Sequence, residues 1–219
     1  MKSVLLALND SPQATAWRDE LRDTGWTVQG QSTRFLETRR HLARRMPAVL
    51  VTDLRLQDGT VIDLIRTLCA GPRAPRVQVL VLAAAEADPL LLDALQAGAD
   101  NFFMVPDAQP GALAAQVRDT LEGGAAIAPW IARRLLAHFA ISGCEPARRT
   151  VEDLSNPLAL TAGECTLLRR LSIGERLADL ARHEGVGPRE LTARVRTVYR
   201  KMQWSLCAGD LRLTRPDLT

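Results

Sequence analysis

The 219-residue sequence has no long hydrophobic segment of the kind that spans a membrane. Its longest uninterrupted apolar run, Val79 to Ala85, has the length of a strand. Met1 and Lys2 lead directly into a strand-like segment, without the apolar region and cleavage site of a secretory signal. We therefore expect a cytoplasmic protein.

Cysteine and histidine are too scattered to indicate a metal site. The four cysteines contain no CxxC pair, and they resemble small buried apolar residues in a reducing compartment: Cys69, Cys144, Cys165 and Cys207. The three histidines also stand far apart in the chain: His41, His138 and His183. From these residues we expect no resident cofactor and no catalytic cluster.

Net charge is distributed unevenly along the chain. Residues 1–121 carry 13 basic and 14 acidic side chains, whereas residues 122–219 carry 15 basic and 11 acidic ones. The basic excess therefore lies in the C-terminal part, which favours a polyanionic partner there.

The N-terminal part shows five alternations of a short apolar run with a helical pattern. Each run has the length of a buried strand, and the runs lie near residues 4–8, 26–29, 49–53, 77–82 and 101–105. This alternation is typical of an α/β domain, and it predicts a flavodoxin-like doubly wound five-stranded parallel sheet over residues 1–121.

An acid, Asp53, ends the third apolar run. In open α/β sheets, ligands and chemistry are found at the carboxyl ends of the strands, so Asp53 is a candidate functional residue. A helix cap or a loop acid is the structural alternative for a lone carboxylate in this place.

The motifs of residues 1–121 resemble those of the receiver domain of two-component response regulators. Asp53 stands where that family has its phosphoacceptor, Leu8–Pro12 matches the acidic pair after the first strand, and Ala97–Phe102 matches the turn into the fifth. The resemblance implies phosphorylation of Asp53 and binding of Mg²⁺ by Asp10 and Asp53.

Three positions depart from the receiver pattern. Asn9 replaces the first acid, Ala83 replaces the hydroxyl residue expected after the fourth strand, and Val105 replaces the lysine expected after the fifth. Because the hydroxyl and the lysine would hold the phosphoryl oxygens, added charge on Asp53 gains no new partner from these positions. We therefore expect a degenerate receiver that serves as a dimerisation or ligand-sensing platform, with Asp53 retained as a loop acid.

The C-terminal part divides into a linker and a helical domain. A linker with one helix is predicted over residues 122–155, where Gly123 and Gly124 interrupt the preceding helix. Residues 156–219 resemble the LuxR-type helix-turn-helix domain of NarL/LuxR regulators, without a gap from Leu160 to Met202. The resemblance implies an all-α domain of four helices, the last from Trp204 to Leu213.

The third helix of that domain carries the residues predicted to meet DNA. By resemblance, Thr192, Ala193 and Arg196 face base edges, and phosphates are expected to be contacted by Arg189, Arg200 and Lys201. The structural alternative is a solvated basic face on a protein-interaction domain.

Together these features predict a sequence-specific DNA-binding transcriptional regulator rather than an enzyme. Helix-turn-helix regulators read paired half-sites as dimers, so we expect a homodimer on double-stranded DNA, with control independent of phosphorylation. Two alternatives remain at this point: a regulator activated by phosphorylation of Asp53 by a sensor kinase, and a protein-interaction adaptor that does not bind DNA.

Overall fold

The computed structural model describes residues 2–69, 77–85, 88–141 and 158–213. The chain forms two units, Met1–Ala125 and Ala126–Thr219. Within the described ranges, no helix combines the length and the apolar character needed to cross a bilayer.

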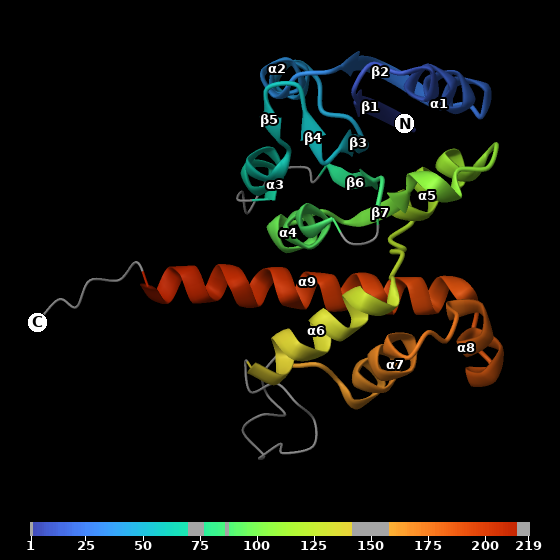
Figure 1. Ribbon diagram of the computed structural model, residues 1–219, viewed down its shortest axis with the longest axis vertical. Coiled ribbons are helices and arrows are strands. Elements are labelled where there is room, and N and C mark those ends of the chain that lie inside the picture. Colours follow the sequence, from blue (N-terminus) through green and yellow to red (C-terminus); the bar gives the residue numbers. More distant parts are fainter. Residues whose placement is uncertain (1, 70–76, 86–87, 142–157, 214–219) are drawn as a thin grey trace, which may run out of the picture. The chain divides into compact units, whose positions relative to one another are not determined.

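The first unit is built on a five-stranded parallel sheet with the strand order β2-β1-β3-β6-β7 (Figure 1). Its strands are β1 (Ser3–Ala7), β2 (Thr27–Ser32), β3 (Val49–Asp53), β6 (Gln78–Ala83) and β7 (Asn101–Met104). Each lies within a few residues of an apolar run in the sequence, so the predicted flavodoxin-like fold is confirmed. The position of β1 and β3 in the middle of the sheet brings the residues that follow them side by side.

Five helices cover this sheet, α1 and α5 on one face and α2, α3 and α4 on the other (Figure 1). They span Pro12–Asp23 (α1), Phe35–Arg44 (α2), Ile62–Cys69 (α3), Pro89–Ala97 (α4) and Ala112–Leu121 (α5). Side chains cap two of them: Ser11 Oγ accepts from the backbone N–H of Ala14, and Asp88 Oδ1 accepts from that of Leu90, both at 3.0 Å. A proline at the first helical position follows each cap, as in many helix starts.

Alternate strand residues fill the core between the sheet and the α1–α5 pair. Its buried members include Trp17 of α1 and Leu82 of β6, with Val105 packed against them from just beyond β7. Phe103 meets Trp17 edge to face, with ring centroids 6.3 Å apart. Burial on both faces explains why the strands read as continuous apolar runs.

A short antiparallel ribbon, β4 (Arg55–Leu56) with β5 (Gly59–Thr60), follows β3 and was not predicted. The residues between its strands form the turn expected from Gln57-Asp58-Gly59. Its Asp58 carboxylate accepts hydrogen bonds from the backbone N–H groups of Phe35, at 2.5 Å, and Leu36, at 3.3 Å. The ribbon therefore caps the start of α2. A single 3₁₀ turn, η1 (Val105–Asp107), follows β7.

In residues 126–141 and 158–213, the second unit forms four helices: α6 (Pro129–Ile141), α7 (Ala162–Ser172), α8 (Leu177–Glu184) and α9 (Pro188–Leu213). The helix predicted for the linker is α6, and it packs against α7 and α9. His138 Nε2 of α6 and Ser205 Oγ of α9 are 2.8 Å apart in a hydrogen bond. The rest of the predicted linker, after residue 141, lies outside the described residues.

The separate fourth helix expected from Trp204 to Leu213 is a wrong prediction, because α9 runs without a break from Pro188 to Leu213. No proline interrupts this stretch, and most of its residues suit a helix. Contacts around the expected break also favour continuity: Gln203 is buried, and Ser205 Oγ donates back to the Met202 carbonyl at 2.8 Å.

Candidate functional site

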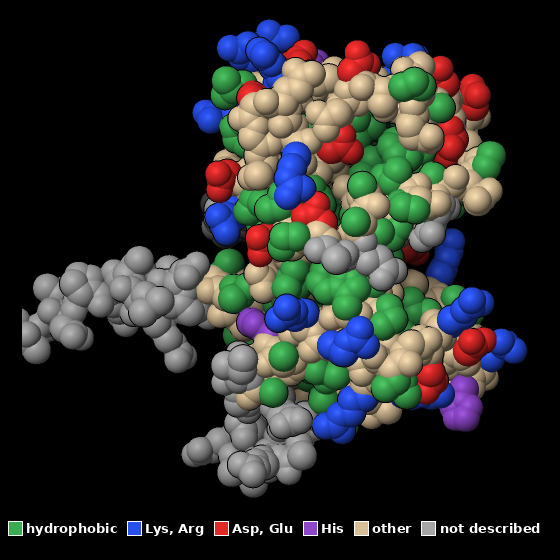
Figure 2. Space-filling model, viewed as in Figure 1, with side chains coloured by type: hydrophobic (Ala, Val, Ile, Leu, Met, Phe, Trp, Pro, Cys, Tyr) green, Lys and Arg blue, Asp and Glu red, His purple; other side chains and the backbone are tan. Residues whose placement is uncertain are grey.

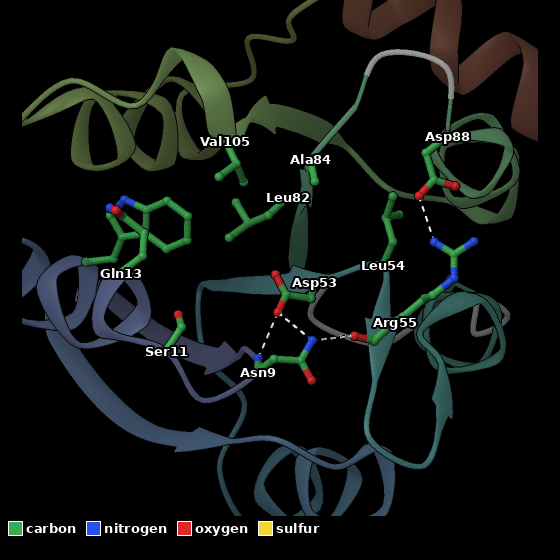
Figure 3. Close-up of a pocket in the computed structure, with 11 residues that line it drawn as sticks. Asn9, Ser11, Gln13, Asp53, Leu54, Arg55, Leu82, Ala84, Asp88 and Val105 are labelled. Carbon is green, nitrogen blue, oxygen red and sulfur yellow. Dashed lines mark hydrogen bonds and ion pairs between the residues drawn. The ribbon is translucent and has the colours of Figure 1, made fainter.

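Asp53 leaves the end of β3 in direct contact with Asn9, which follows β1 (Figure 3). One carboxylate oxygen, Oδ2, accepts from the Asn9 backbone N–H at 2.7 Å and from Asn9 Nδ2 at 2.9 Å. Asn9 Nδ2 also donates to the Arg55 carbonyl at 2.7 Å. Because both partners of this side chain are acceptors, the amide must present its NH₂ group to them.

Burial raises the pKa of the Asp53 carboxyl group, since removal from water disfavours the charged form. The hydrogen bonds from the backbone and side chain of Asn9 act in the opposite direction and are the smaller effects. Asp53 is therefore a half-buried acid stabilised by neutral N–H donors rather than by a positive charge.

The surroundings of Asp53 do not suit Mg²⁺. This ion takes near-octahedral oxygen coordination, whereas Oδ2 of Asp53 already accepts two N–H groups. Asp10 is exposed and does not line the cavity into which Asp53 opens. Nowhere among the described residues do three or more His, Cys, Asp or Glu side chains come together as metal ligands.

A cavity of about 320 Å³ lies over the carboxyl ends of the strands beside Asp53 (Figure 3). Two of the three degenerate receiver positions, Asn9 and Val105, line it. Ala83 does not: it is fully buried at the end of β6, and its neighbours Leu82 and Ala84 face the cavity instead. Trp17 completes an apolar wall.

Two of the residues that line this cavity, Arg55 and Asp88, form an ion pair. Arg55 Nη1 is 2.7 Å from Asp88 Oδ2, while the other oxygen of Asp88 caps α4. Arg55 is thus directed toward Asp88 and away from Asp53 (Figure 3). The pairing could not be read from the sequence, because 33 residues separate its members.

The second candidate site is the α7–α8–α9 arrangement. Thr161 caps α7 in a reciprocal box with Glu164, since Thr161 Oγ1 accepts from the Glu164 N–H and the Glu164 carboxylate accepts from the Thr161 N–H. Gly185 ends α8 in the left-handed conformation, at φ +67°, which favours glycine. The turn at Gly185 separates α8 from α9, as the predicted helix-turn-helix requires.

The structure distributes the six predicted DNA-contacting residues over different environments. Arg189 and Ala193 are exposed, and Thr192 and Arg200 are half-buried. Arg196, by contrast, is only 2% exposed. It follows that in this arrangement Arg196 does not present its guanidinium group at the surface.

Lys201, predicted to meet phosphate, pairs with an acid of α7. Its Nζ lies 2.6 Å from Glu164 Oε2 and 3.0 Å from the Ala159 carbonyl. Both charged side chains are largely buried, at 11% exposed for Lys201 and 9% for Glu164. This ion pair joins α7 to α9. In the sequence, the only indication of a constrained acid was the position of Glu164 in the capping box of α7.

Another basic side chain of α9, Arg194, is also paired with acids. Arg194 pairs with Glu190 one turn earlier, at 2.5 Å, and with Glu184 of α8, at 2.9 Å. Figure 2 accordingly shows Lys and Arg side chains spread over the visible surface, rather than gathered in one patch on the helical unit. The pair with Glu184 could not be read from the sequence pattern of α9, because Glu184 belongs to α8.

No protein-family model matches the chain. The DNA-binding transcriptional activator DevR/DosR of Mycobacterium tuberculosis is 33% identical over 148 residues, which form 67% of this chain and 63% of that protein. The match therefore spans less than two thirds of the curated relative.

Two solved structures are similar to parts or most of this chain. A chain from two RcsB dimers bound to two parallel DNAs has a TM-score of 0.50 at 17% identity, and the match covers 94% of this chain and 98% of that one. The receiver domain of a response regulator from Bermanella marisrubri has a TM-score of 0.49 at 24% identity, over 55% of this chain and 98% of that one. The likeness to RcsB shows the fold: an α/β unit followed by a helical unit.

Proposed function

The chain is a homologue of DNA-binding response regulators of the NarL/LuxR type, and from this premise we propose that it is a transcriptional regulator whose control does not depend on phosphorylation. The observation that carries the DNA-binding part is the 33% identity to a DNA-binding activator. The α7–α8–α9 arrangement, with its capped α7 and its glycine turn before α9, supports it.

The proposal assigns DNA contacts to the side chains of α9. Arg189 and Arg200 contact phosphates, which supplies affinity without sequence preference. Base edges are read by Thr192, Ala193 and Arg196, the arginine through a bidentate pair with guanine. The ion pair with Glu164 gives Lys201 a structural role in place of the predicted phosphate contact.

Because Arg196 is buried, its proposed contact with a base requires a conformational change. A side chain that is 2% exposed must become accessible before it reaches a base. Sequence-specific binding therefore requires a change around α9, whereas contact of Arg189 with phosphate requires none, because Arg189 is already exposed. Weak sequence-independent binding should precede specific binding.

Independence from phosphorylation is supported by the contacts of Asp53. A phosphoryl switch needs partners that bind the modified form more tightly than the unmodified one. Asn9 donors occupy Oδ2, Val105 stands in place of a lysine, and Arg55 is paired with Asp88. No cation that could bind a phosphoryl group is thus directed at Asp53 from the residues that line its cavity.

We further propose that the protein acts as a homodimer on paired half-sites and is located in the cytoplasm.

One observation favours conventional activation as the second candidate: Asp53 opens into a cavity at the carboxyl end of β3, where a phosphodonor could reach it. The adaptor alternative predicts no salt-dependent binding to any duplex.

The intact mass of the protein after incubation with a small-molecule phosphodonor and Mg²⁺ separates the two candidates. The proposal predicts no stoichiometric adduct on the wild-type protein. The Asp53→Asn variant, treated in the same way, reports adducts at other sites. A stoichiometric adduct that is absent from this variant would establish Asp53 as a working phosphoacceptor.

A further inference from the structure

The cavity beside Asp53 contains a negative charge that no neighbouring cation balances. Three of its lining residues are charged, Asp53, Arg55 and Asp88, and the last two are paired with each other at 2.7 Å. Asn9 gives hydrogen bonds to Asp53 but no positive charge. A half-buried carboxylate without a paired cation among the lining residues therefore faces an open cavity, where it can meet a positively charged ligand.

Only one oxygen of that carboxylate is engaged by the protein. Both Asn9 donors reach Oδ2, and among the described residues none donates to Oδ1. Figure 3 shows the second oxygen of Asp53 turned away from Asn9 and toward Leu82. Oδ1 is thus placed to accept a hydrogen bond from a molecule in the cavity.

The rest of the cavity is mostly apolar. Trp17, Leu82 and Val105 form a wall that belongs to the core of the unit. Ser11 and Gln13, at the start of α1, add a hydroxyl and an amide. A volume of about 320 Å³ lies at the lower end of the range for ligand pockets, and it accommodates a single aromatic ring or a short aliphatic group.

We infer that this cavity binds a small organic cation, a primary ammonium or amidinium group on a compact apolar body. The nitrogen donates to Asp53 Oδ1, and the body packs against Trp17, Leu82 and Val105. An anion is disfavoured by the Asp53 charge, and a neutral molecule leaves that charge unbalanced. A bare metal ion finds too few oxygen ligands here.

The apolar wall and the carboxylate have separate roles in this inference. The carboxylate selects a cationic nitrogen, while the wall selects an apolar body over a polyamine or a hydrated ion. The position of Val105 is central, because a lysine there would itself place an ammonium group in the cavity. The absence of a lysine at position 105, which weakens the receiver as a phosphoryl switch, thus also leaves room in the cavity and leaves the Asp53 charge available to a ligand.

Titration of the full-length protein with benzylamine tests the inference, with benzyl alcohol as the neutral match and benzoate as the anionic one. Backbone amide shifts of Asn9 and Asp53 in NMR spectra report occupancy at the site. Benzylamine should bind saturably and at least about tenfold more tightly than either match, since hydrogen bonds to charged groups are the stronger ones. Equal binding of the three probes, or no saturable binding of benzylamine, would overturn it.

Two variants locate the probe. Asp53→Asn keeps the shape of the side chain and should weaken benzylamine at least about tenfold. Asp93→Asn, which removes an exposed acid of α4 outside the cavity, makes the same change in net charge and should leave the affinity unchanged. Similar losses of benzylamine affinity in both variants would show that binding depends on the net charge of the protein, and would contradict the assigned site.

A second pair of variants separates charge from shape at position 105. Val105→Lys should abolish benzylamine binding, because the new ammonium competes for Asp53, whereas Val105→Met fills similar space without charge and should retain most of it. An equal loss of benzylamine affinity in both variants would contradict the role assigned to the carboxylate. Thermal unfolding of each variant verifies that it is folded.

Any effect of the ligand on DNA binding rests on the proposed function, whereas binding to the cavity does not. Titration of the same samples with a DNA duplex measures DNA binding separately from benzylamine binding. Absence of DNA binding with saturable benzylamine binding would refute the proposed function and support the site. DNA binding without benzylamine binding would refute the site and leave the proposed function standing.

Discussion

Asp53 in the α/β unit and the basic side chains of α9 in the helical unit differ in whether an oppositely charged partner is present. In the α/β unit, Asp53 is held by neutral donors from Asn9 and faces a cavity without a cation directed at it. In the helical unit, Lys201, which was predicted to contact phosphate, and Arg194 are each paired with acids of α7, α8 or α9. A charge in a motif position therefore indicates function only when its partners are known.

The largest expected effect comes from breaking the buried pair in the helical unit. Lys201→Ala leaves Glu164 buried without its cation and should lower the free energy of unfolding by about 3 kcal/mol. Urea denaturation followed by circular dichroism measures it.

Two controls accompany the Lys201 measurement. Arg189→Ala, at an exposed position of α9, should change stability by less than about 0.5 kcal/mol. A double variant, Lys201→Met with Glu164→Gln, should recover most of the loss, because neither charge is then left alone. If Lys201→Ala were no more destabilising than Arg189→Ala, the pair would have no structural role.

The next effect concerns DNA recognition by α9. Arg196→Ala should reduce the preference for a specific duplex over a random one by about tenfold, since a bidentate contact to a base is worth roughly 1–3 kcal/mol. Arg200→Ala should weaken binding to both duplexes equally and reduce the salt dependence. Fluorescence anisotropy at several salt concentrations distinguishes the two patterns, and the same loss on both duplexes from both variants would contradict the assigned roles.

A smaller effect is expected at Tyr199, the single tyrosine of the chain. Its buried hydroxyl donates to the Ala126 carbonyl at 2.7 Å, so Tyr199→Phe should cost about 1 kcal/mol of stability. Urea denaturation of the variant beside the wild-type protein at neutral pH gives this value. An unchanged stability would mean that the hydrogen bond makes no net contribution.

The same tyrosine predicts a pH dependence. Burial raises the pKa of Tyr199 above its ordinary value near 10. The unfolded chain therefore loses this proton at a lower pH than the folded protein does. As a result, this group leaves the free energy of unfolding unchanged below about pH 10 and lowers it as the pH rises further. Tyrosinate absorbance should appear only with unfolding, whereas ionisation of the folded protein near pH 10 would contradict the burial.

An effect of similar size, reversible by a divalent ion, is expected from Asn9→Asp in the α/β unit. It replaces an amide donor to Asp53 with a second carboxylate, and the repulsion should lower the free energy of unfolding by about 1 kcal/mol without divalent ions. Millimolar Mg²⁺ should restore the loss, because the pair of acids then offers oxygen ligands. Asn9→Ala, which adds no charge, should show no Mg²⁺ effect; equal responses of the two variants would exclude a cation site.

Much of the fold could be predicted from the sequence, because strands buried on both faces appear as apolar runs and helix starts carry Ser11, Asp88 or Thr161 as caps. The continuation of α9 to Leu213 could not be predicted in this way. The family pattern suggested a break near Trp204, whereas local helix propensity and the contacts of Gln203 and Ser205 continue the helix.

The candidate sites were predictable to different degrees. Asn9, Asp53 and Val105 follow strands of one parallel sheet, so their convergence followed from topology, and the structure places all three around one cavity. The partners of Lys201 and Arg55 lie 37 and 33 residues away, and no local pattern specifies such pairs. Burial of Arg196 was equally inaccessible, because helical spacing alone placed it beside exposed positions.

Control without phosphorylation is tested most directly by the affinity of the wild-type protein for a specific DNA duplex before and after treatment with a phosphodonor and Mg²⁺, beside Asp53→Asn. Our account predicts one dissociation constant for the wild-type protein in both states, since no partner at Asp53 distinguishes a phosphorylated form. An affinity that rises at least about tenfold on treatment in the wild-type protein, but not in Asp53→Asn, would contradict it.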